Sequence, residues 1–342
     1  MEIVSLFSGC GGLDLGFELA GFSIVWANDN DKDVWETYTR NFPGTYLDKR
    51  DLRVIPVSDI PDCVGIIGGP PCQSWSEAGN RKGIEDERGR LVLNYIDIIS
   101  RKRPYFFLFE NVAGILHRRH KKAFNLILTS LEKAGYDIYY KLIDTYDYLV
   151  PQNRKRVFII GFRKDLQISY SFPKPFDRKK TLRDAIYDLK DNVVEPLEKN
   201  RHNPKVIVPN HEYYIGSFSS IYMSRNRVRS WNEPSFTIQA SGRHAPIHPQ
   251  ANKMIKVSKD KYIFDPESPY PYRRLSVREC ARIQTFPDDF IFVYEKLDAG
   301  YKMIGNAVPV KLAEILAVSI KETLRRKIGK ERTKILLPLF LA

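Results

Sequence analysis

The sequence predicts an α/β fold in which a parallel sheet is covered by helices on both faces. Over residues 1–165, short apolar runs alternate with segments whose apolar residues recur at helical spacing. The apolar runs contain almost no polar residues, which is typical of parallel strands that are buried on both faces. A glycine-rich turn at 8–12 follows the first run, as in many sheets that bind a nucleotide.

The predicted elements follow one another in a regular order. Strands are expected at residues 3–7, 23–27, 64–67, 105–109, 138–143 and 157–162, and helices at 13–20, 91–100 and 123–134. Asp31 is expected to cap a further helix, because its short side chain can accept a hydrogen bond from the first turn. Gly21 and Gly135 are expected to end the helices that precede them.

The alternating pattern fails after residue 172, which predicts a second domain. Residues 173–274 are rich in Pro, Asn, Ser and Tyr and show no helical period, so we expect a smaller, irregular domain there. Within 201–250 there are six Lys and Arg against two Asp and Glu. Helical spacing returns at 275–283 and 310–324, and we expect residues 275–342 to rejoin the domain that residues 1–172 begin.

The composition favours a polyanionic partner and a reducing compartment. The chain has 54 Lys and Arg against 41 Asp and Glu, and the net charge of +13 suits a nucleic acid. Its four cysteines are too few and too scattered for a disulfide framework and have no metal-ligand spacing. The first residues do not resemble a signal peptide, and no apolar run reaches the roughly 18 residues of a membrane helix. We therefore expect a cytoplasmic protein without a membrane or metal requirement.

A single cysteine stands on a stiff turn directly after the strand expected at 64–67. The run Gly-Gly-Pro-Pro-Cys-Gln-Ser-Trp-Ser at 68–76 places Cys72 beyond the carboxyl end of that strand, the edge where open α/β sheets bind ligands. Two prolines preset the turn. A thiol held on a rigid loop can act as a covalent nucleophile, and the alternative is a buried, inert cysteine.

Charged side chains lie at the ends of two further strands. Glu110 follows the apolar run 106–109, where burial would raise its pKa and suit it to donate a proton, or it is simply a paired strand-end acid. Arg154 and Arg156 precede the strand at 157–162, where a guanidinium can hold a carbonyl oxygen or a phosphate. The alternative for both arginines is a solvated basic turn.

Two aspartates are candidates for binding a nucleoside. Asp29 ends the strand at 23–27, about 20 residues beyond the glycine turn, where an acid can bind ribose hydroxyls. Asp51 could contact an adenine in the same way. Either aspartate could instead be a helix cap or a turn residue.

Taken together, these segments resemble the DNA (cytosine-5) methyltransferase family. The ordered motifs are Phe-x-Gly-x-Gly-Gly at 7–12, Pro-Cys-Gln at 71–73, Glu-Asn-Val at 110–112, Gln-x-Arg-x-Arg at 152–156 and Gly-Asn-Ala-Val at 305–308. The resemblance spans nearly the whole chain. It is closest to the HaeIII-type (GGCC) modification methyltransferases, through Arg278-Glu279-Cys280-Ala281-Arg282 and residues 224–229.

The resemblance implies a Rossmann-like S-adenosylmethionine-dependent domain with a smaller target-recognition domain at 173–274. Cys72 would add to carbon 6 of cytosine, Glu110 would bond ring nitrogen 3, and Arg156 would hold the O2 atom with Arg154 beside it. The residues that would cradle S-adenosylmethionine, and its product S-adenosylhomocysteine, are Phe7, Gly9, Gly11, Gly12, Asp29, Asp51, Leu52, Pro70, Leu91, Asn306 and Val308. Asp29 stands where the family more often has glutamate.

The resemblance also implies duplex DNA as the substrate, with the target base flipped out of the stack. Arg225, Arg227 and Arg243 are candidate readers of guanine, with Thr237 in the recognition segment, and the implied site is GGCC. The alternative is that these arginines bind phosphate only. A monomer working beside a cognate restriction endonuclease is expected. The rival functions are an RNA cytosine methyltransferase of the tRNA-modifying branch, a non-catalytic DNA-binding regulator and, more remotely, a nicotinamide oxidoreductase.

Overall fold

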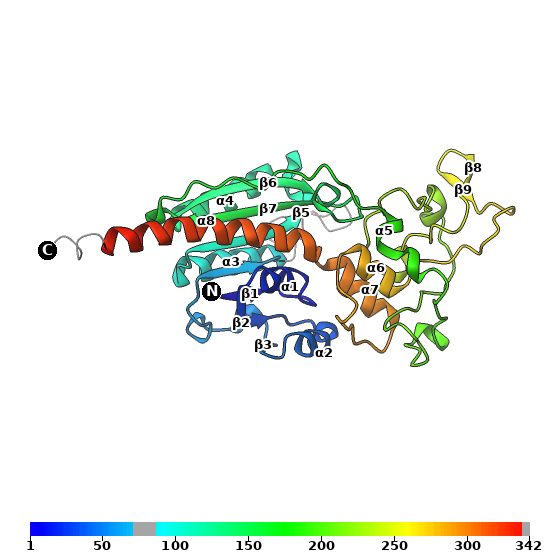
Figure 1. Ribbon diagram of the computed structural model, residues 1–342, viewed down its shortest axis with the longest axis horizontal. Helices are drawn as coiled ribbons and strands as arrows, with labels where there is room; N and C mark the ends of the chain where they lie inside the picture. Colours follow the sequence, from blue (N-terminus) through cyan, green and yellow to red (C-terminus); the bar gives the residue numbers. More distant parts are fainter. Residues whose placement is uncertain (71–86, 337–342) are drawn as a thin grey trace.

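A seven-stranded sheet forms the centre of the computed structural model, with strand order β3-β2-β1-β4-β5-β7-β6 (Figure 1). The structure describes the backbone of residues 1–70 and 87–336, and the side chains of 1–70 and 90–327. The strands are β1 (Glu2–Leu6), β2 (Ser23–Asn28), β3 (Tyr46–Asp48), β4 (Gly65–Gly68), β5 (Phe106–Val112), β6 (Tyr136–Asp144) and β7 (Lys155–Arg163). The α/β class and the expected strands are therefore confirmed.

The sheet is parallel from β3 to β5, but β7 runs antiparallel to both of its neighbours. The expectation of a wholly parallel sheet was wrong at this edge. The short connection 145–154 joins β6 to β7 without a crossover helix, and only antiparallel strands can be joined in this way. The reversal carries the start of β7 to the end of β5, because Arg156 pairs with Val112 in the ladder.

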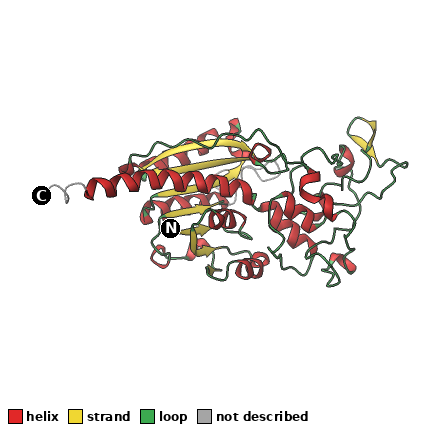
Figure 2. Ribbon diagram, viewed as in Figure 1, coloured by secondary structure: helices red, strands yellow, loops and turns green. Residues whose placement is uncertain are grey.

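Helices cover both faces of the sheet (Figure 2). In chain order the helices of the described chain are α1 (Gly12–Leu19), α2 (Lys32–Asn41), α3 (Glu87–Lys102), α4 (Lys121–Lys133), α5 (Leu182–Ile186), α6 (Val277–Ile283), α7 (Leu297–Asn306) and α8 (Val310–Leu336). Of these, α5, α6 and α7 lie away from the sheet, beside the irregular region (Figure 1). Asp31 caps α2 by accepting a hydrogen bond from the Asp33 amide, as expected. Gly21 and Gly135 have φ of 80° and 95°, which confirms them as helix stops.

Side chains of β5 alternate between two cores, one on each face of the sheet. Phe106 and Leu108 belong to the core that α1 and α8 cover, and Phe107 and Phe109 belong to the core under α3 and α4. The stretch Leu297–Lys327 is long and apolar enough to cross a membrane, but 67% of its apolar window is buried inside the protein, as in a core helix.

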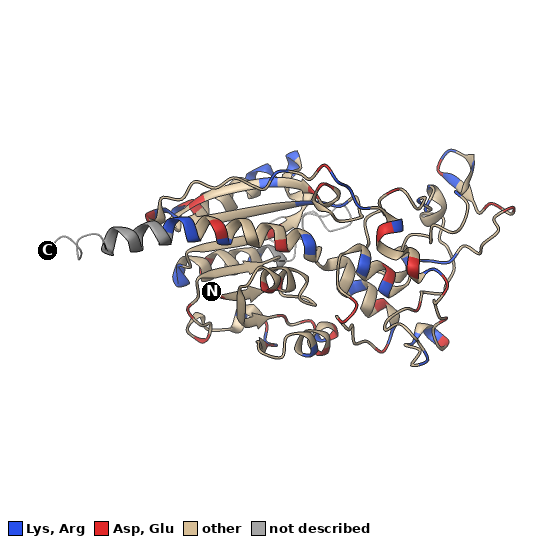
Figure 3. Cartoon of the chain, in the orientation of Figure 1, with Lys and Arg blue, Asp and Glu red and all other residues tan. Residues whose placement is uncertain are grey.

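The region after residue 172 is irregular, and the helices that follow it pack against both parts of the chain (Figure 1). Its β8 (Ile255–Ser258) and β9 (Lys261–Ile263) form a small hairpin that carries basic residues (Figure 3). A separate apolar cluster around Tyr222, Val228 and Ile247 supports this region. The sequence pattern gave no indication of α7, whose Gly300 and Gly305 lower its helix propensity.

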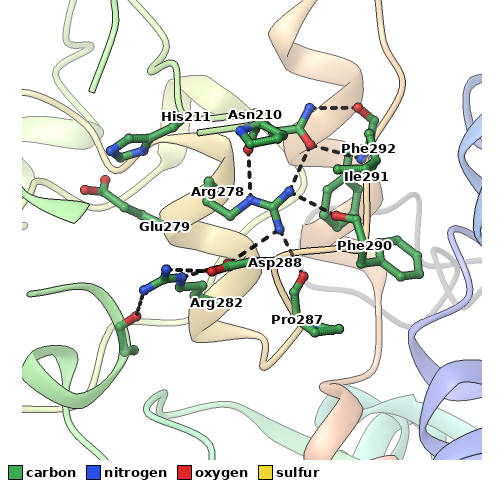
Figure 4. Close-up of polar contacts among 12 residues, drawn as sticks. Asn210, His211, Arg278, Glu279, Arg282, Pro287, Asp288, Phe290, Ile291 and Phe292 are labelled. Carbon is green, nitrogen blue, oxygen red and sulfur yellow. Dashed lines mark hydrogen bonds and ion pairs between the residues drawn. The ribbon is translucent and has the colours of Figure 1, made fainter. Parts of the chain in front are cut away.

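A buried arginine on α6 holds the loops around it together (Figure 4). Arg278 is fully buried, and its guanidinium donates to the carbonyls of Pro209, Pro287 and Phe290 and to Oδ1 of Asn210. A side chain with five donors can satisfy acceptors from two separate loops at once. Arg278 therefore ties segment 209–210 of the irregular region to the loop 287–292.

Candidate active site

A cavity of about 370 Å³ opens at the carboxyl ends of β1, β2, β4 and β5. This is the edge at which open α/β sheets bind ligands. The lining residues that the sequence had singled out are Phe7, Gly9, Gly12, Asp29, Pro70, Glu110, Arg154, Arg156, Asn306 and Val308. The fold thus brings residues from three distant parts of the chain to one cavity.

The glycine turn after β1 forms the floor of this cavity by close backbone packing. Gly9 and Gly11 have φ of 56° and 91°, a region that favours glycine. A Cβ on Gly11 would overlap the Phe42 ring, and a Cβ on Gly12 would lie 2.6 Å from the carbonyl oxygen of Val308. A larger residue at Gly11 or Gly12 would therefore force neighbouring groups to move.

Asp29 lies at the end of β2 and is fixed by two backbone amides. Its Oδ2 accepts from the amide of Gly9 at 2.8 Å and its Oδ1 from the amide of Asp31 at 2.9 Å. Burial raises the pKa of this carboxyl, and the two amide bonds oppose the shift. Ser8 also lines the cavity, and its buried hydroxyl has no hydrogen-bond partner among the described residues. The turn, the fixed carboxylate and the unpartnered hydroxyl fit a nucleoside-bearing cofactor.

Four of the expected cofactor residues lie outside the described lining of the cavity: Gly11, Asp51, Leu52 and Leu91. The Asp51 carboxylate instead accepts from the amide of Arg53 and pairs with its guanidinium at 2.6 Å, as the cap of a short helical turn. Leu52 packs in the core under α3 and α4. For Asp51 the geometry therefore matches the cap alternative, and its contact with an adenine stays a prediction.

Glu110 and Arg156 face one another at the edge of the cavity. The Nε of Arg156 lies 3.1 Å from Oε1 of Glu110, and the two side chains are only 15% and 13% exposed. Burial raises the pKa of Glu110, while the charges of Arg156 and Arg154 oppose the shift. A Cβ on Gly69 would lie 3.0 Å from Oε2 of Glu110. The second carboxylate oxygen is therefore next to Gly69, which precedes Cys72 by three residues in the sequence.

Cys72 itself lies outside the described residues. The last described residue before it is Pro70, whose carbonyl accepts a hydrogen bond from Nδ2 of Asn111 at 3.3 Å. Asn111 follows Glu110 directly in β5. The chain leading to Cys72 is thus anchored beside Glu110, and the role of Cys72 remains a prediction.

Arg154 does not have the free guanidinium that the sequence suggested. It is 2% exposed, and its Nη atoms donate to the carbonyls of Ile238, Gly305 and Ala307. The Nε atom has no partner among the described residues. The solvated-turn alternative was also wrong for Arg154. Its terminal nitrogens bind protein carbonyls, and a contact of Arg154 with the base stays a prediction, as does the contact of Arg156 with O2.

A second cavity, of about 260 Å³, lies in the irregular region. Its lining consists of Asn153, Arg225, Arg227, Phe236, Thr237, Gln239, His244 and Pro246. Arg225 is exposed and makes no hydrogen bond or ion pair to a described residue. Arg227, by contrast, is 8% exposed and donates from Nε and Nη2 to the carbonyls of Tyr222 and Ile221. Arg243 is exposed but does not line this cavity.

Asp14 is a buried acid of the first cavity that the motif analysis missed. It lies in the first turn of α1, fully buried, and accepts hydrogen bonds from the Ser5 hydroxyl at 2.7 Å and the Tyr38 hydroxyl at 2.6 Å. Burial raises its pKa from 3.8 to about 7, against the effect of the two hydroxyls. In the sequence, Asp14 is an acid in the first turn of a helix that follows a glycine turn. Such a residue is common at helix starts, so the sequence did not mark it as part of a cavity.

We expect Asp14→Asn to change how the free energy of unfolding depends on pH. Because the folded pKa is raised, the wild-type protein gains stability from Asp14 at low pH and loses it as pH rises from about 4 to about 7. The variant lacks this loss, so its stability relative to wild type should rise over that window by up to about 4 kcal/mol. Urea unfolding at several pH values measures this. Parallel curves for the two proteins would contradict the assignment.

The sheet, with a glycine-lined cavity at its carboxyl edge, defines the class of Rossmann-like methyltransferases. The chain belongs to the C-5 cytosine-specific DNA methylase family, whose sequence profile matches residues 1–322. Its enzymatic activity is therefore methyl transfer to cytosine in DNA, and this family uses S-adenosylmethionine as the methyl donor.

Several relatives match over almost their entire length. The chain is 60% identical over 325 residues to the Type II methyltransferase M.MthTI of Methanothermobacter thermautotrophicus, which covers 95% of this chain and 98% of the relative. It is 55% identical to the Type II methyltransferase M.FnuDI of Fusobacterium nucleatum, covering 97% and 98%. A crystal structure of a putative prophage-encoded DNA modification methyltransferase from E. coli has a TM-score of 0.74 at 25% identity, covering 95% and 99%. These likenesses place the enzyme among modification methyltransferases.

Proposed function

We propose that the enzyme methylates carbon 5 of a flipped-out cytosine in duplex DNA at GGCC sites, as the modification partner of a restriction endonuclease. The observation that carries the proposal is the Glu110–Arg156 pair at the cavity edge, beside the loop that leads to Cys72. A base buried in a duplex cannot reach this cavity, so it must leave the stack. We expect the enzyme to work in the cytoplasm as a monomer.

The side chains of this edge match the needs of the reaction. Carbon 5 of cytosine is a weak nucleophile, and addition of the Cys72 thiolate to carbon 6 would make it enamine-like. Glu110, whose pKa is raised by burial, would donate a hydrogen bond to ring nitrogen 3 and so favour this addition. Arg156 would hold the O2 atom. Once carbon 5 carries the methyl group, loss of its proton and departure of the thiolate restore the aromatic ring and the free enzyme.

S-adenosylmethionine, when bound, supplies the methyl group. We propose that the turn around Gly9 and Gly12 and the Asp29 carboxylate hold its nucleoside, with Asn306 and Val308 also lining the cavity. Within residues 1–70 and 87–336, no three His, Cys, Asp or Glu side chains gather as ligands for a metal ion. The absence of a metal requirement remains a prediction.

The irregular region at 173–274 is proposed to grip the DNA and to read its sequence. The exposed Arg225 beside the second cavity can contact both guanine O6 and N7, which is the most common specific contact. Arg227 is less suited to this role because two of its guanidinium nitrogens already bind backbone carbonyls. Basic residues on the β8–β9 hairpin and the exposed Arg243 are proposed to bind phosphate (Figure 3).

We expect Arg225→Ala to weaken discrimination between GGCC and single-base variants by about 1–3 kcal/mol, while keeping the fold. Arg227→Ala is the matched comparison, and we expect it to lower stability more than discrimination. Competition for methylation between duplexes that differ at one base measures the first effect, and thermal unfolding measures the second. Unchanged discrimination in the Arg225 variant would make it a phosphate contact.

The proposed site is tested by labelled methyl transfer to three substrates: a GGCC duplex, a duplex with the same composition but no GGCC, and tRNA. Transfer to the first alone supports the proposal. Transfer to the duplex without GGCC would contradict the proposed recognition sequence but not the DNA methyltransferase activity. Transfer to tRNA alone would instead indicate an enzyme of the tRNA-modifying branch. Methylation-sensitive sequencing of DNA from an expressing host would then identify the recognition site directly.

A further inference from the structure

A buried network of two glutamines and one arginine connects the second cavity to the first. Gln152 and Gln284 are fully buried and Arg154 is 2% exposed. Gln152 and Arg154 belong to one segment, and Gln284 lies 132 residues from Gln152 in the sequence. Oε1 of Gln152 accepts from the amide of Ile238 at 2.7 Å, and its Nε2 donates to Oε1 of Gln284 at 2.7 Å. The network therefore begins in the segment that carries Thr237.

The other end of the network holds the carboxyl end of α7. Nε2 of Gln284 donates to the carbonyls of Ile304 and Ala307 at 2.8 and 3.1 Å. Arg154 bonds Ala307 and Gly305 as well, and it also holds the carbonyl of Ile238 at 3.0 Å. The residues on either side of Ala307, namely Asn306 and Val308, line the first cavity.

The recognition segment and α7 also touch directly. A Cβ added to Gly305 would overlap the backbone of residues 239–240. On the other side, the Thr237 hydroxyl donates to the carbonyl of Asn153 at 2.6 Å, and the Asn153 amide donates to Ser235. Segments 152–154, 235–239 and 304–307 thus form one hydrogen-bonded unit between the two cavities. Movement of one of these segments relative to the others would break buried hydrogen bonds.

We infer that Gln152 and Gln284 are positioning residues that couple DNA binding to cofactor binding. A duplex that contacts the second cavity fixes segment 235–239, and the network fixes the end of α7 that forms one side of the first cavity. Binding at either site therefore favours binding at the other, and the coupling must be equal in both directions. This inference rests on the proposed function, because it takes the second cavity as a DNA contact.

The test uses Gln284→Met, which keeps the side-chain length but removes its three hydrogen bonds. The dissociation constant of S-adenosylhomocysteine is measured by calorimetry without DNA and with a saturating duplex that the wild-type enzyme methylates. For wild type we expect the duplex to tighten binding at least fivefold, within the usual range of coupling. For the variant we expect this ratio to fall toward one, with a smaller change in the affinity measured without DNA.

Two further variants separate coupling from general destabilisation. Tyr136→Phe also removes a buried hydrogen bond, from the tyrosine hydroxyl to the carbonyl of Pro104, but Tyr136 lines neither cavity. It should keep the wild-type ratio. Gln152→Met should lower this ratio of affinities as Gln284→Met does. The double variant should lower it no further than either single variant, because the bond between the two glutamines joins them in one path.

The outcomes distinguish this inference from the proposed function. If wild type methylates a duplex but that duplex does not change the affinity for S-adenosylhomocysteine, the coupling is absent and the inference is wrong. It is also wrong if Gln284→Met keeps the full ratio. If wild type methylates no duplex at all, the proposed function fails first.

Discussion

Replacing Glu110 by Ala should lower kcat by a factor of about 10² to 10⁴, the usual contribution of a positioned acid or base. In the proposed mechanism this carboxyl, which lies at the cavity edge and whose pKa is raised by burial, donates a hydrogen bond to a ring nitrogen of the base. Its loss would remove that bond and leave the buried guanidinium of Arg156 without its carboxylate. Single-turnover methylation with saturating DNA and cofactor measures the effect on chemistry apart from binding.

Glu110→Gln is the matched control for this result. The amide keeps the shape of the side chain and can still donate a hydrogen bond, but it cannot carry a charge or exchange a proton. We expect its rate to lie between those of the wild type and the alanine variant, with cofactor affinity close to wild type. A tenfold or smaller loss in the alanine variant, with its fold intact, would remove Glu110 from the mechanism.

Replacing Arg278 by Met should lower the free energy of unfolding by about 3–5 kcal/mol. The substitution leaves the carbonyls of Pro209, Pro287 and Phe290 without their donor, and an unsatisfied buried acceptor costs about 1–3 kcal/mol. Desolvation lowers the pKa of this guanidinium, and the charge of Asp288, whose Oδ1 lies 4.0 Å from Nη1, opposes the shift. The midpoint of urea unfolding reports the loss.

The control for Arg278 lies on the same helix. Arg282 pairs with Asp188 and Asp288, whose side chains are 66% and 54% exposed, so Arg282→Met should cost no more than about 1 kcal/mol. Equal losses in the two variants would contradict the role assigned to Arg278. If Arg278→Met does not fold, Arg278→Lys should fold with a smaller loss, since one ammonium group can reach only part of the acceptors.

The sequence alone identified the residues that follow directly from strand ends. Glu110 comes directly after an apolar run and Asp29 two residues after one, and parallel strands bring such positions to one edge, so both could be placed in a common site before the structure. The glycine turn was equally clear, because only close approach or positive φ explains so many glycines after a strand. These local patterns are enough to predict the α/β fold class and the position of the cavity at the carboxyl edge of the sheet.

What the sequence could not show depends on partners that are distant in the chain. Arg154 looked like Arg156 in the motif, yet its acceptors are carbonyls 84 and more residues away, which no local pattern reveals. The acceptors of Arg227 are close in sequence, but its burial depends on a small separate core whose residues are spread along the chain. No local pattern reveals that burial. The reversed direction of β7 also escaped prediction, because an apolar run carries no sign of its direction.

The proposed chemistry depends on a covalent bond between the Cys72 sulfur and carbon 6 of the target base. A duplex with 5-fluorocytosine at the target position, incubated with S-adenosylmethionine, would trap that bond because the fluorine cannot leave as a proton. On a denaturing gel the account predicts a protein–DNA adduct for wild type and none for Cys72→Ser. Wild type that methylates the normal duplex but forms no adduct, or a serine variant that forms as much as wild type, would contradict it.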